Sequence, residues 1–276
     1  MTPFRRFAAF LALTLGFTLP ASATTTSTDF TDLWWNSSES GWGFNVIHQG
    51  NTLFGTLFVY GTDQSARWYV ADAMVPQAAS AGTFIFKSKF YQTSGPYFGA
   101  VPFNPAATVT EVGEATITFP TATTATLVYN VGTTTITKQL TRQTFRSNTT
   151  TGQYIGGMTA ITSSCANSGN NGLPANIIGD VVSTFNGTSV TFRVDYVLQG
   201  NNAVCNFAGL YSQQGRLGTV TNGSWSCAIG TTTLNNGTFA LSQVDVQVNG
   251  LYSNILAADQ ICAYTGRFGG LRNANN

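Results

Sequence analysis

Charged side chains are scarce in this sequence of 276 residues, in which only 8% are Asp, Glu, Lys or Arg. Twelve basic residues stand against eleven acidic ones, and they form no basic stripe or tract. Proteins that bind nucleic acid or anionic lipid concentrate positive charge on one face or in one segment. We therefore expect no nucleic-acid partner.

Groups that carry catalysis are also few. The chain has a single histidine, His48, no Gly-x-Ser-x-Gly motif and no Cys-x-x-Cys pair. One imidazole without a second histidine or a cysteine is seldom a metal ligand. We expect His48 in the core, hydrogen-bonded beside the turn at residues 49–51, with the rim of a pocket as the alternative. The sequence predicts neither a metal site nor a cofactor.

The N-terminus has the pattern of an export signal. Arg5 and Arg6 precede an apolar run over residues 7–19, and the small residues Ala21 and Ala23 follow it. A charged start, a short apolar run and a small-x-small cleavage site are typical of a secretory signal peptide, and the run is too short to span a bilayer. We predict a signal peptide at residues 1–23. The mature chain would be periplasmic or extracellular, with no integral membrane span.

All four cysteines lie in the second half of the chain: Cys165, Cys205, Cys227 and Cys262. An even number of cysteines in an exported protein predicts disulfides, and their wide spacing does not suit zinc. Three connectivities are possible. One hypothesis pairs Cys205 with Cys227 across neighbouring strands, and Cys165 with Cys262 across the first and last strands of a closing barrel.

After the signal peptide the sequence alternates with period two between turn residues, which predicts strands and no long helix. In the first half the predicted strands are residues 41–48, 52–60, 66–72, 83–91, 115–119, 125–131 and 134–142. In the second half they are residues 153–164, 177–185, 189–198, 203–212, 218–227, 238–248 and 261–268.

Turn residues and a polar break divide these strands. Asn-Gly pairs at residues 186–187, 222–223, 236–237 and 249–250 predict four turns, and the proline-containing segment 91–112 predicts a long loop. The polar stretch 147–152 separates a Trp-rich β domain (24–147) from a disulfide-containing β domain (148–276). Closure removes exposed sheet edges, so we predict an all-β protein with two antiparallel β-barrel-like domains in tandem. Sandwiches and an integral outer-membrane barrel are the alternatives.

Four of the five tryptophans lie between Trp34 and Trp68. Indole is large, stiff and partly polar, so such a cluster forms either a core plug or a platform for a flat ligand. Trp42 shares a strand face with Phe44 and Val46, which favours the core for that residue. The ligand-binding residues predicted from the cluster and its polar neighbours are Trp35, Asn36, Glu39, Trp42, Arg67, Trp68 and Tyr69.

The segment Trp34-Trp35-Asn36-x-x-Glu39-Ser40-Gly41-Trp42-Gly43 resembles the opening of a group of exported, uncharacterised proteobacterial β-rich proteins. The resemblance continues through His48-Gln49-Gly50 and Arg67-Trp68-Tyr69 and ends near residue 145. It implies an exported β-rich first half and brings no known activity. The early tryptophan also bears a looser likeness to avidin and lipocalin barrels, although Leu33 stands before Trp34.

These patterns predict a non-enzymatic binding or surface-interaction protein for a small sugar-like or aromatic ligand. One alternative is a secreted hydrolase that uses Glu39 with Asp32, Asp63 or Asp72. A general acid needs the pKa of its carboxyl raised, which desolvation among aromatics would do. Otherwise Glu39 would accept backbone hydrogen bonds in its turn or pair with Arg67. The remaining alternative is a structural envelope protein whose tryptophans are all core.

Overall fold

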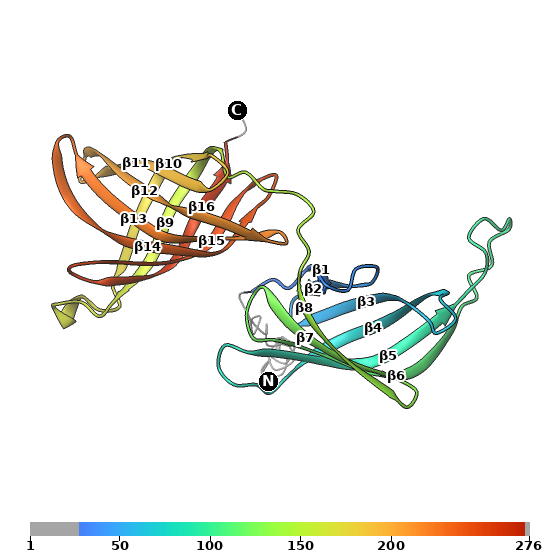
Figure 1. The fold of residues 1–276 in the computed structure, drawn as a ribbon. Coiled ribbons are helices and arrows are strands. Elements are labelled where there is room, and N and C mark those ends of the chain that lie inside the picture. The colour runs from blue at the N-terminus through green and yellow to red at the C-terminus, as the bar shows by residue number, and fades with distance from the viewer. Residues whose placement is uncertain (1–27, 274–276) are drawn as a thin grey trace, which may run out of the picture.

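The computed structural model describes residues 28–273 and forms two closed antiparallel β-barrels, each of eight strands (Figure 1). This confirms the predicted all-β fold and selects barrels over sandwiches. The predicted signal peptide lies outside the described residues. The predicted domain boundary at 147/148 falls in the connection between the two barrels, which spans residues 143–151.

The strands follow one another around each barrel in chain order. The first barrel contains β1 (Asp32–Trp35), β2 (Gly43–Gln49), β3 (Thr52–Tyr60), β4 (Ala66–Gln77), β5 (Phe84–Ser94), β6 (Thr108–Phe119), β7 (Thr124–Val131) and β8 (Thr134–Arg142). The second contains β9 (Gly152–Ser163), β10 (Pro174–Phe185), β11 (Ser189–Leu198), β12 (Asn201–Gln214), β13 (Leu217–Ile229), β14 (Thr232–Val246), β15 (Gly250–Asp259) and β16 (Ala263–Arg272). A short 3-10 turn, η1 (Ser168–Asn170), precedes β10.

Both barrels are plugged at one end by the same arrangement of side chains. In the first, Trp34 pairs with Arg142 across β1 and β8, the guanidinium lies 4.8 Å over the indole, and Trp34 Nε1 donates to the carbonyl of Phe30. In the second, Tyr154 pairs with Arg272 across β9 and β16, with the guanidinium 5.1 Å over the ring.

The tyrosine hydroxyl likewise donates to a carbonyl four residues earlier, that of Thr150. Phe30 and Thr150 are both fully buried. In each barrel the segment before the first strand therefore crosses one end and closes it. We call this the plugged end and the opposite end the mouth.

Buried side chains fill the barrels in the alternation that strands impose. In the first barrel an aromatic series runs from the plug, where Phe30 stacks on Phe119 at 4.0 Å, to Phe90, which stacks on Tyr69 near the mouth. The second barrel is built around Phe268, whose ring lies 4.9 Å from that of Phe192 and 5.2 Å from that of Phe207. The shared face predicted for Phe44 and Val46 is confirmed, since both are fully buried.

The structure corrects several predicted element boundaries. The sequence prediction omitted β1 and β15, and the predicted loop 91–112 is shorter, because β5 runs to Ser94 and β6 starts at Thr108. The Asn-Gly pairs at 222–223 and 236–237 lie inside β13 and β14 and are not turns. Those at 186–187 and 249–250 lie at strand connections, as predicted.

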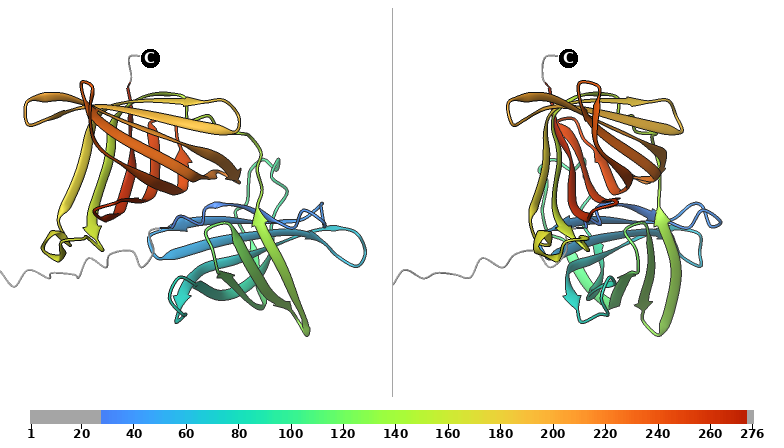
Figure 2. Two further views of the ribbon diagram at one scale, coloured as in Figure 1. Left: turned by 60° about the vertical axis from the view of Figure 1, so that its left-hand side comes forward. Right: turned by 90° about the vertical axis from the view of Figure 1, so that its left-hand side faces the viewer.

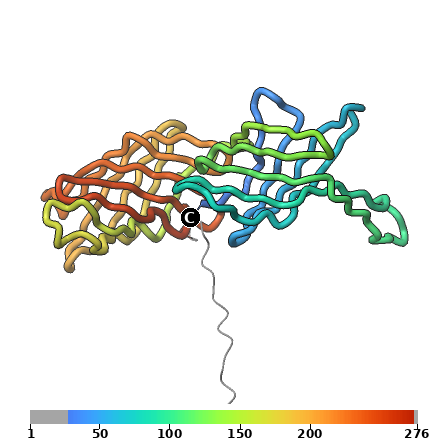
Figure 3. The backbone as a smooth tube through the Cα atoms, turned by 90° about the horizontal axis from the view of Figure 1, so that it is seen from below, coloured from blue at the N-terminus to red at the C-terminus, as the bar shows by residue number. Residues whose placement is uncertain are grey.

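The two barrels meet near their plugged ends and lie end to end in Figure 3, while Figure 2 shows the strands of the second barrel inclined to those of the first. Arg216, in the β12–β13 loop, pairs with Asp29 of the first barrel and Asp245 of its own. Its backbone N–H donates to Asp32 over 3.1 Å. These contacts lie at the plugged ends, and neither mouth takes part in them.

Both hypothesised disulfides are present, Cys205–Cys227 between β12 and β13 and Cys165–Cys262 beside the mouth of the second barrel. Two disulfides fit an oxidising compartment. Within residues 28–273, no helix has the length and apolar character needed to cross a membrane.

Candidate aromatic site on the first barrel

The structure separates the seven predicted site residues into three groups. Trp42, Glu39 and Tyr69 gather at the mouth of the first barrel, where Trp42 is half-buried against the core and Tyr69 is 9% exposed. Trp35 and Trp68 point to the outer wall, because strand neighbours Trp34 and Tyr69 point inward. The remaining two, Asn36 and Arg67, lie in or beside the mouth loops.

Trp42 covers the mouth together with an ion pair. Lys138, on β8, pairs with Glu39 and places its Nζ 5.4 Å from the centroid of the Trp42 ring. This brings together residues 99 positions apart in the sequence. Glu39 therefore does not pair with Arg67, as one interpretation of the sequence held; Arg67 Nη2 instead pairs with Asp63 at 2.9 Å. Asn36 accepts hydrogen bonds from the Ser38 N–H and hydroxyl and so shapes the loop.

The electrostatics of Glu39 differ from those of a general acid. The hydrogen bond from Lys138 lowers the pKa of the Glu39 carboxyl, and the Trp42 indole contributes in the same direction. A hydrolase of the kind considered from the sequence would need that pKa raised. Of its three candidate partners, Asp32 pairs with Arg142 at the plugged end, Asp63 pairs with Arg67, and Asp72 lines an outer-wall groove.

The outward aromatics form a row across β1 to β4. Phe58 pairs with Trp68 on one side and with Gly43 on the other, and the register of β1 on β2 continues the row to Trp35. Gly43 supplies the space for this arrangement, because a Cβ there would lie 2.8 Å from the Phe58 ring. The Phe58 ring therefore lies over Gly43, between the two tryptophans.

Two members of this aromatic row (Trp35, Phe58, Trp68) are open to solvent, and Trp35 is half-buried. Trp68 is 52% exposed, Phe58 is 41% exposed, and the nearby Tyr60 is 63% exposed. Strands lie about 4.8 Å apart, so four strands carry the row over roughly 15 Å. The rings of the row can stack on an apolar surface of a ligand, and the indole N–H groups can donate hydrogen bonds.

Sequence reasoning missed Phe58 and Tyr60. The signal was present, since β3 has apolar residues on both faces, with Leu53 and Leu57 inward and Phe58 and Tyr60 outward. A strand with one buried face needs apolar residues on that face only, so the outward aromatic residues of β3 were a signal of an exposed apolar surface.

His48 lies at the plugged end, where its ring stacks on Phe30 at 5.6 Å and its Nδ1 accepts a hydrogen bond from the Phe30 N–H. This places it in the core, although its partner is the segment before β1. Burial lowers the pKa of the imidazole, with Asp29 opposing that shift. The structure gives His48 a role in closing the barrel end.

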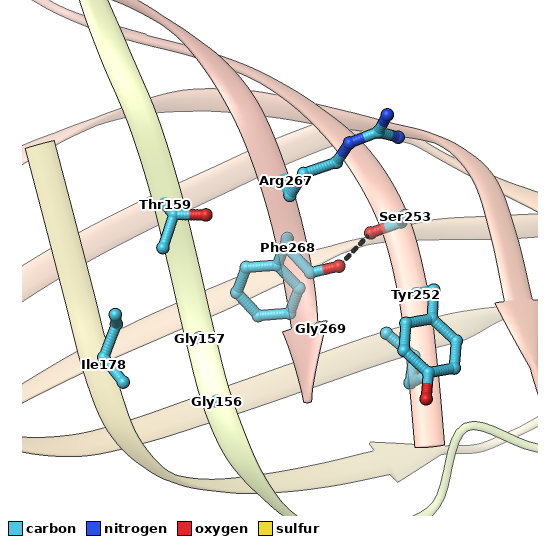
Figure 4. A pocket seen from close by; sticks show the side chains of 10 residues that line it. Gly156, Gly157, Thr159, Ile178, Tyr252, Ser253, Arg267, Phe268 and Gly269 are labelled. Atoms are coloured by element: carbon cyan, nitrogen blue, oxygen red, sulfur yellow. Dashed lines mark hydrogen bonds between the residues drawn. The ribbon is translucent and has the colours of Figure 1, made fainter. Parts of the chain in front are cut away.

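The outer wall of the second barrel has a groove of about 430 Å³ (Figure 4). Its floor is the paired glycines Gly157 and Gly269, and Ile178 and Tyr252 bound it on the flanking strands. Arg267 lies at its upper edge and is hydrogen-bonded to Asn254. The groove presents one cation and no carboxylate, a set that suits binding and lacks an acid–base pair.

Across residues 28–273, no three His, Cys, Asp or Glu side chains are placed to hold a metal ion. No family model matches the chain, and neither a curated protein nor a solved structure matches it. The aromatic row is thus the arrangement on which a functional proposal for the Trp-rich barrel can rest.

Proposed function

We propose that this protein is an exported, non-enzymatic binding module whose first barrel attaches to neutral glycans through the aromatic row. The observation that carries the proposal is the exposure of Trp68, 52%, beside Phe58 on one outer wall. Exposed large aromatics that are contiguous on a surface are characteristic of an interaction site. The apolar faces of sugar rings stack on indole, while their hydroxyls remain in water.

The shape of the site favours a polymer over a single sugar. The outer wall of a barrel is convex and cannot enclose a small ligand, whereas ligand pockets usually bury most of a small molecule. A chain of sugars can contact several rings at once, and linked contacts add avidity that none has alone. The low charge of the protein, 8% of residues, favours a neutral polysaccharide over an anionic one.

Affinity electrophoresis of the intact mature protein in gels that contain soluble neutral β-glucan or galactomannan tests this proposal, together with sedimentation on cellulose and chitin. We expect retention on at least one of these glycans. Trp68→Ala should weaken it by about tenfold, or about 1.4 kcal/mol, and Trp35→Ala by a similar factor.

Tyr252→Ala is the matched control, since Tyr252 is 39% exposed on the outer wall of the second barrel. It should leave retention unchanged. Loss of retention in Tyr252→Ala but not in the tryptophan variants would transfer the site to the groove of the second barrel. Absence of retention on every glycan would reject the proposal.

A further inference from the structure

The mouth of the second barrel contains a cavity of about 340 Å³. Its deep wall includes Trp225, Met158 and Cys227, each 3% exposed or less, and Tyr196 and Tyr264 stand nearer the entrance. The Tyr154–Arg272 plug closes the other end of this barrel. The cavity is therefore a blind pocket within a closed barrel, a location that binding sites favour.

The deep wall is apolar, and the indole N–H in it already has a hydrogen-bond partner. Trp225 Nε1 donates to the carbonyl of Thr238 at 3.2 Å, so the indole presents carbon to the cavity. The Tyr264 ring meets Trp225 edge-on at 6.2 Å and fixes its orientation. Cys227 is held in the disulfide with Cys205 and has no thiol to react.

The rest of the lining is mostly apolar, apart from the amides of Asn176 and Asn235. Leu198, Leu234 and Ile261 line the cavity from three different segments and are 37%, 42% and 55% exposed. Single exposed apolar residues are ordinary, but three around one opening form an apolar rim. Such a rim stabilises an apolar molecule that passes through it.

The carboxylate of Asp259, beside this site, is already hydrogen-bonded within the protein. Asp259 accepts hydrogen bonds from the N–H groups of Ile261 and Cys262 and from the Tyr264 hydroxyl at 2.7 Å. The described residues that line the cavity are all uncharged. A charged ligand would therefore be desolvated without a partner, which is costly.

One hydrogen-bond donor in the cavity has a weak partner. The Tyr196 hydroxyl lies 3.7 Å from Cys205 Sγ, and a disulfide sulfur carries no hydrogen, so the hydroxyl is the donor to a weak acceptor. An oxygen or nitrogen acceptor on a ligand would be a better partner.

We propose that the mouth of the second barrel binds a small, uncharged, planar molecule that packs against Trp225 and accepts a hydrogen bond from Tyr196. The cavity is at the lower end of the roughly 300–1,000 Å³ of typical ligand pockets, so the ligand is no larger than a bicyclic aromatic. This site is independent of the aromatic row on the first barrel.

The test uses the intact mature protein and 1-naphthylamine, a planar bicyclic fluorophore that is uncharged at neutral pH. We expect saturable enhancement of its emission with energy transfer from Trp225, the only tryptophan of the second barrel. Ala175→Phe adds bulk inside the cavity and should weaken binding at least tenfold, while Thr191→Phe, which adds it on the outer wall, should not change it. Leu234→Asp, at the exposed rim, should also weaken binding and requires no repacking of the core.

Two further ligands test the chemistry. Tyr196→Phe should weaken binding of 2-acetonaphthone, which has a carbonyl acceptor, several-fold and leave the amine fluorophore unchanged. The anionic 1-naphthoate should bind at least tenfold more weakly than 2-acetonaphthone. Equal binding of the fluorophore to the wild type, Ala175→Phe and Leu234→Asp would overturn the proposal, as would equal affinity for the anion.

Discussion

The tryptophans of the first barrel differ in exposure because strand parity sends neighbours to opposite faces. Trp34 is fully buried in the plug, Trp42 is half-buried at the mouth, and Trp35 and Trp68 face outward. The side of Trp42 could be predicted, since it continues the alternation of Phe44 and Val46. Its partner Lys138 could not, because the pair is made by β8, which is far away in sequence.

Substitution of single tryptophans should separate these environments. Trp42→Ala removes packing against the core and the contact with Lys138, and should lower the free energy of unfolding by about 3 kcal/mol. Trp68→Ala removes a side chain that already faces solvent, and should lower it by less than about 1 kcal/mol. Urea unfolding followed by circular dichroism measures both changes. Equal losses in the two variants would contradict the assignment of Trp42 to the core and Trp68 to the surface.

At the scale of strands, period-two alternation located most elements. The Asn-Gly pairs predicted turns wrongly where the glycine lies within a strand and lets a neighbouring group approach closely. Gly237 lies within β14 and cannot carry a side chain, because a Cβ there would be 1.9 Å from the carbonyl oxygen of Ala258 on the next strand. Asn222 has a positive φ of 50° at an irregularity in the pairing of β13, which bends the strand without ending it. A sequence pattern cannot distinguish a glycine that turns the chain from one that admits a neighbour.

Gly43 offers a test of the aromatic row as an element. Gly43→Val places carbon where the Phe58 ring lies, and the contacting atoms are at the far end of a side chain that can move. We expect the barrel to fold with a modest loss of stability while Phe58 leaves its place between Trp35 and Trp68. Glycan retention should then fall about as much as in Trp68→Ala. Gly50→Val is the control. It strains the backbone, because Gly50 has a φ of 59°, but it displaces no side chain, because nothing lies within 4 Å of an added Cβ.

If Gly43→Val keeps full retention, the position of Phe58 does not matter to binding, and the proposed row reduces to its two tryptophans. A melting temperature lower in Gly50→Val than in Gly43→Val, with retention intact, would show that stability and retention are separable in this barrel.

At the scale of the whole molecule, the succession of short strands and the need to close sheet edges were sufficient to predict two barrels, although one strand of each, β1 and β15, was missed. The relative placement of the barrels was not predictable, because it depends on contacts such as that of Arg216 N–H with Asp32, 184 residues apart. Asp32 also pairs with the buried Arg142, which contacts the Trp34 plug. The junction between the barrels is thus built onto the plug of the first.

Gly215 explains how closely the two ends approach. It has a φ of 61°, and a Cβ there would lie 2.4 Å from Asp32 Oδ2 and 2.5 Å from Arg142 Cβ. Its N–H donates to the Thr144 hydroxyl at 2.8 Å. The β12–β13 loop therefore fits against the first barrel through backbone as well as through the Arg216 side chain.

Removal of the Arg216 side chain should loosen this junction while both barrels stay folded. Arg216→Ala loses the ion pairs with Asp29 and Asp245 but keeps the backbone contacts, so we expect a loss of about 1 to 2 kcal/mol. Calorimetry should show the two barrels unfolding at more separate temperatures than in the wild type, and small-angle scattering should show a larger radius of gyration. Arg193→Ala is the control, because its ion pair with Asp195 lies on the exposed wall of the second barrel, and it should change neither measurement. Identical scattering and calorimetry for the two variants would mean that the side chain of Arg216 does not hold the barrels together, and that the connection at residues 143–151 and the Gly215 contacts suffice.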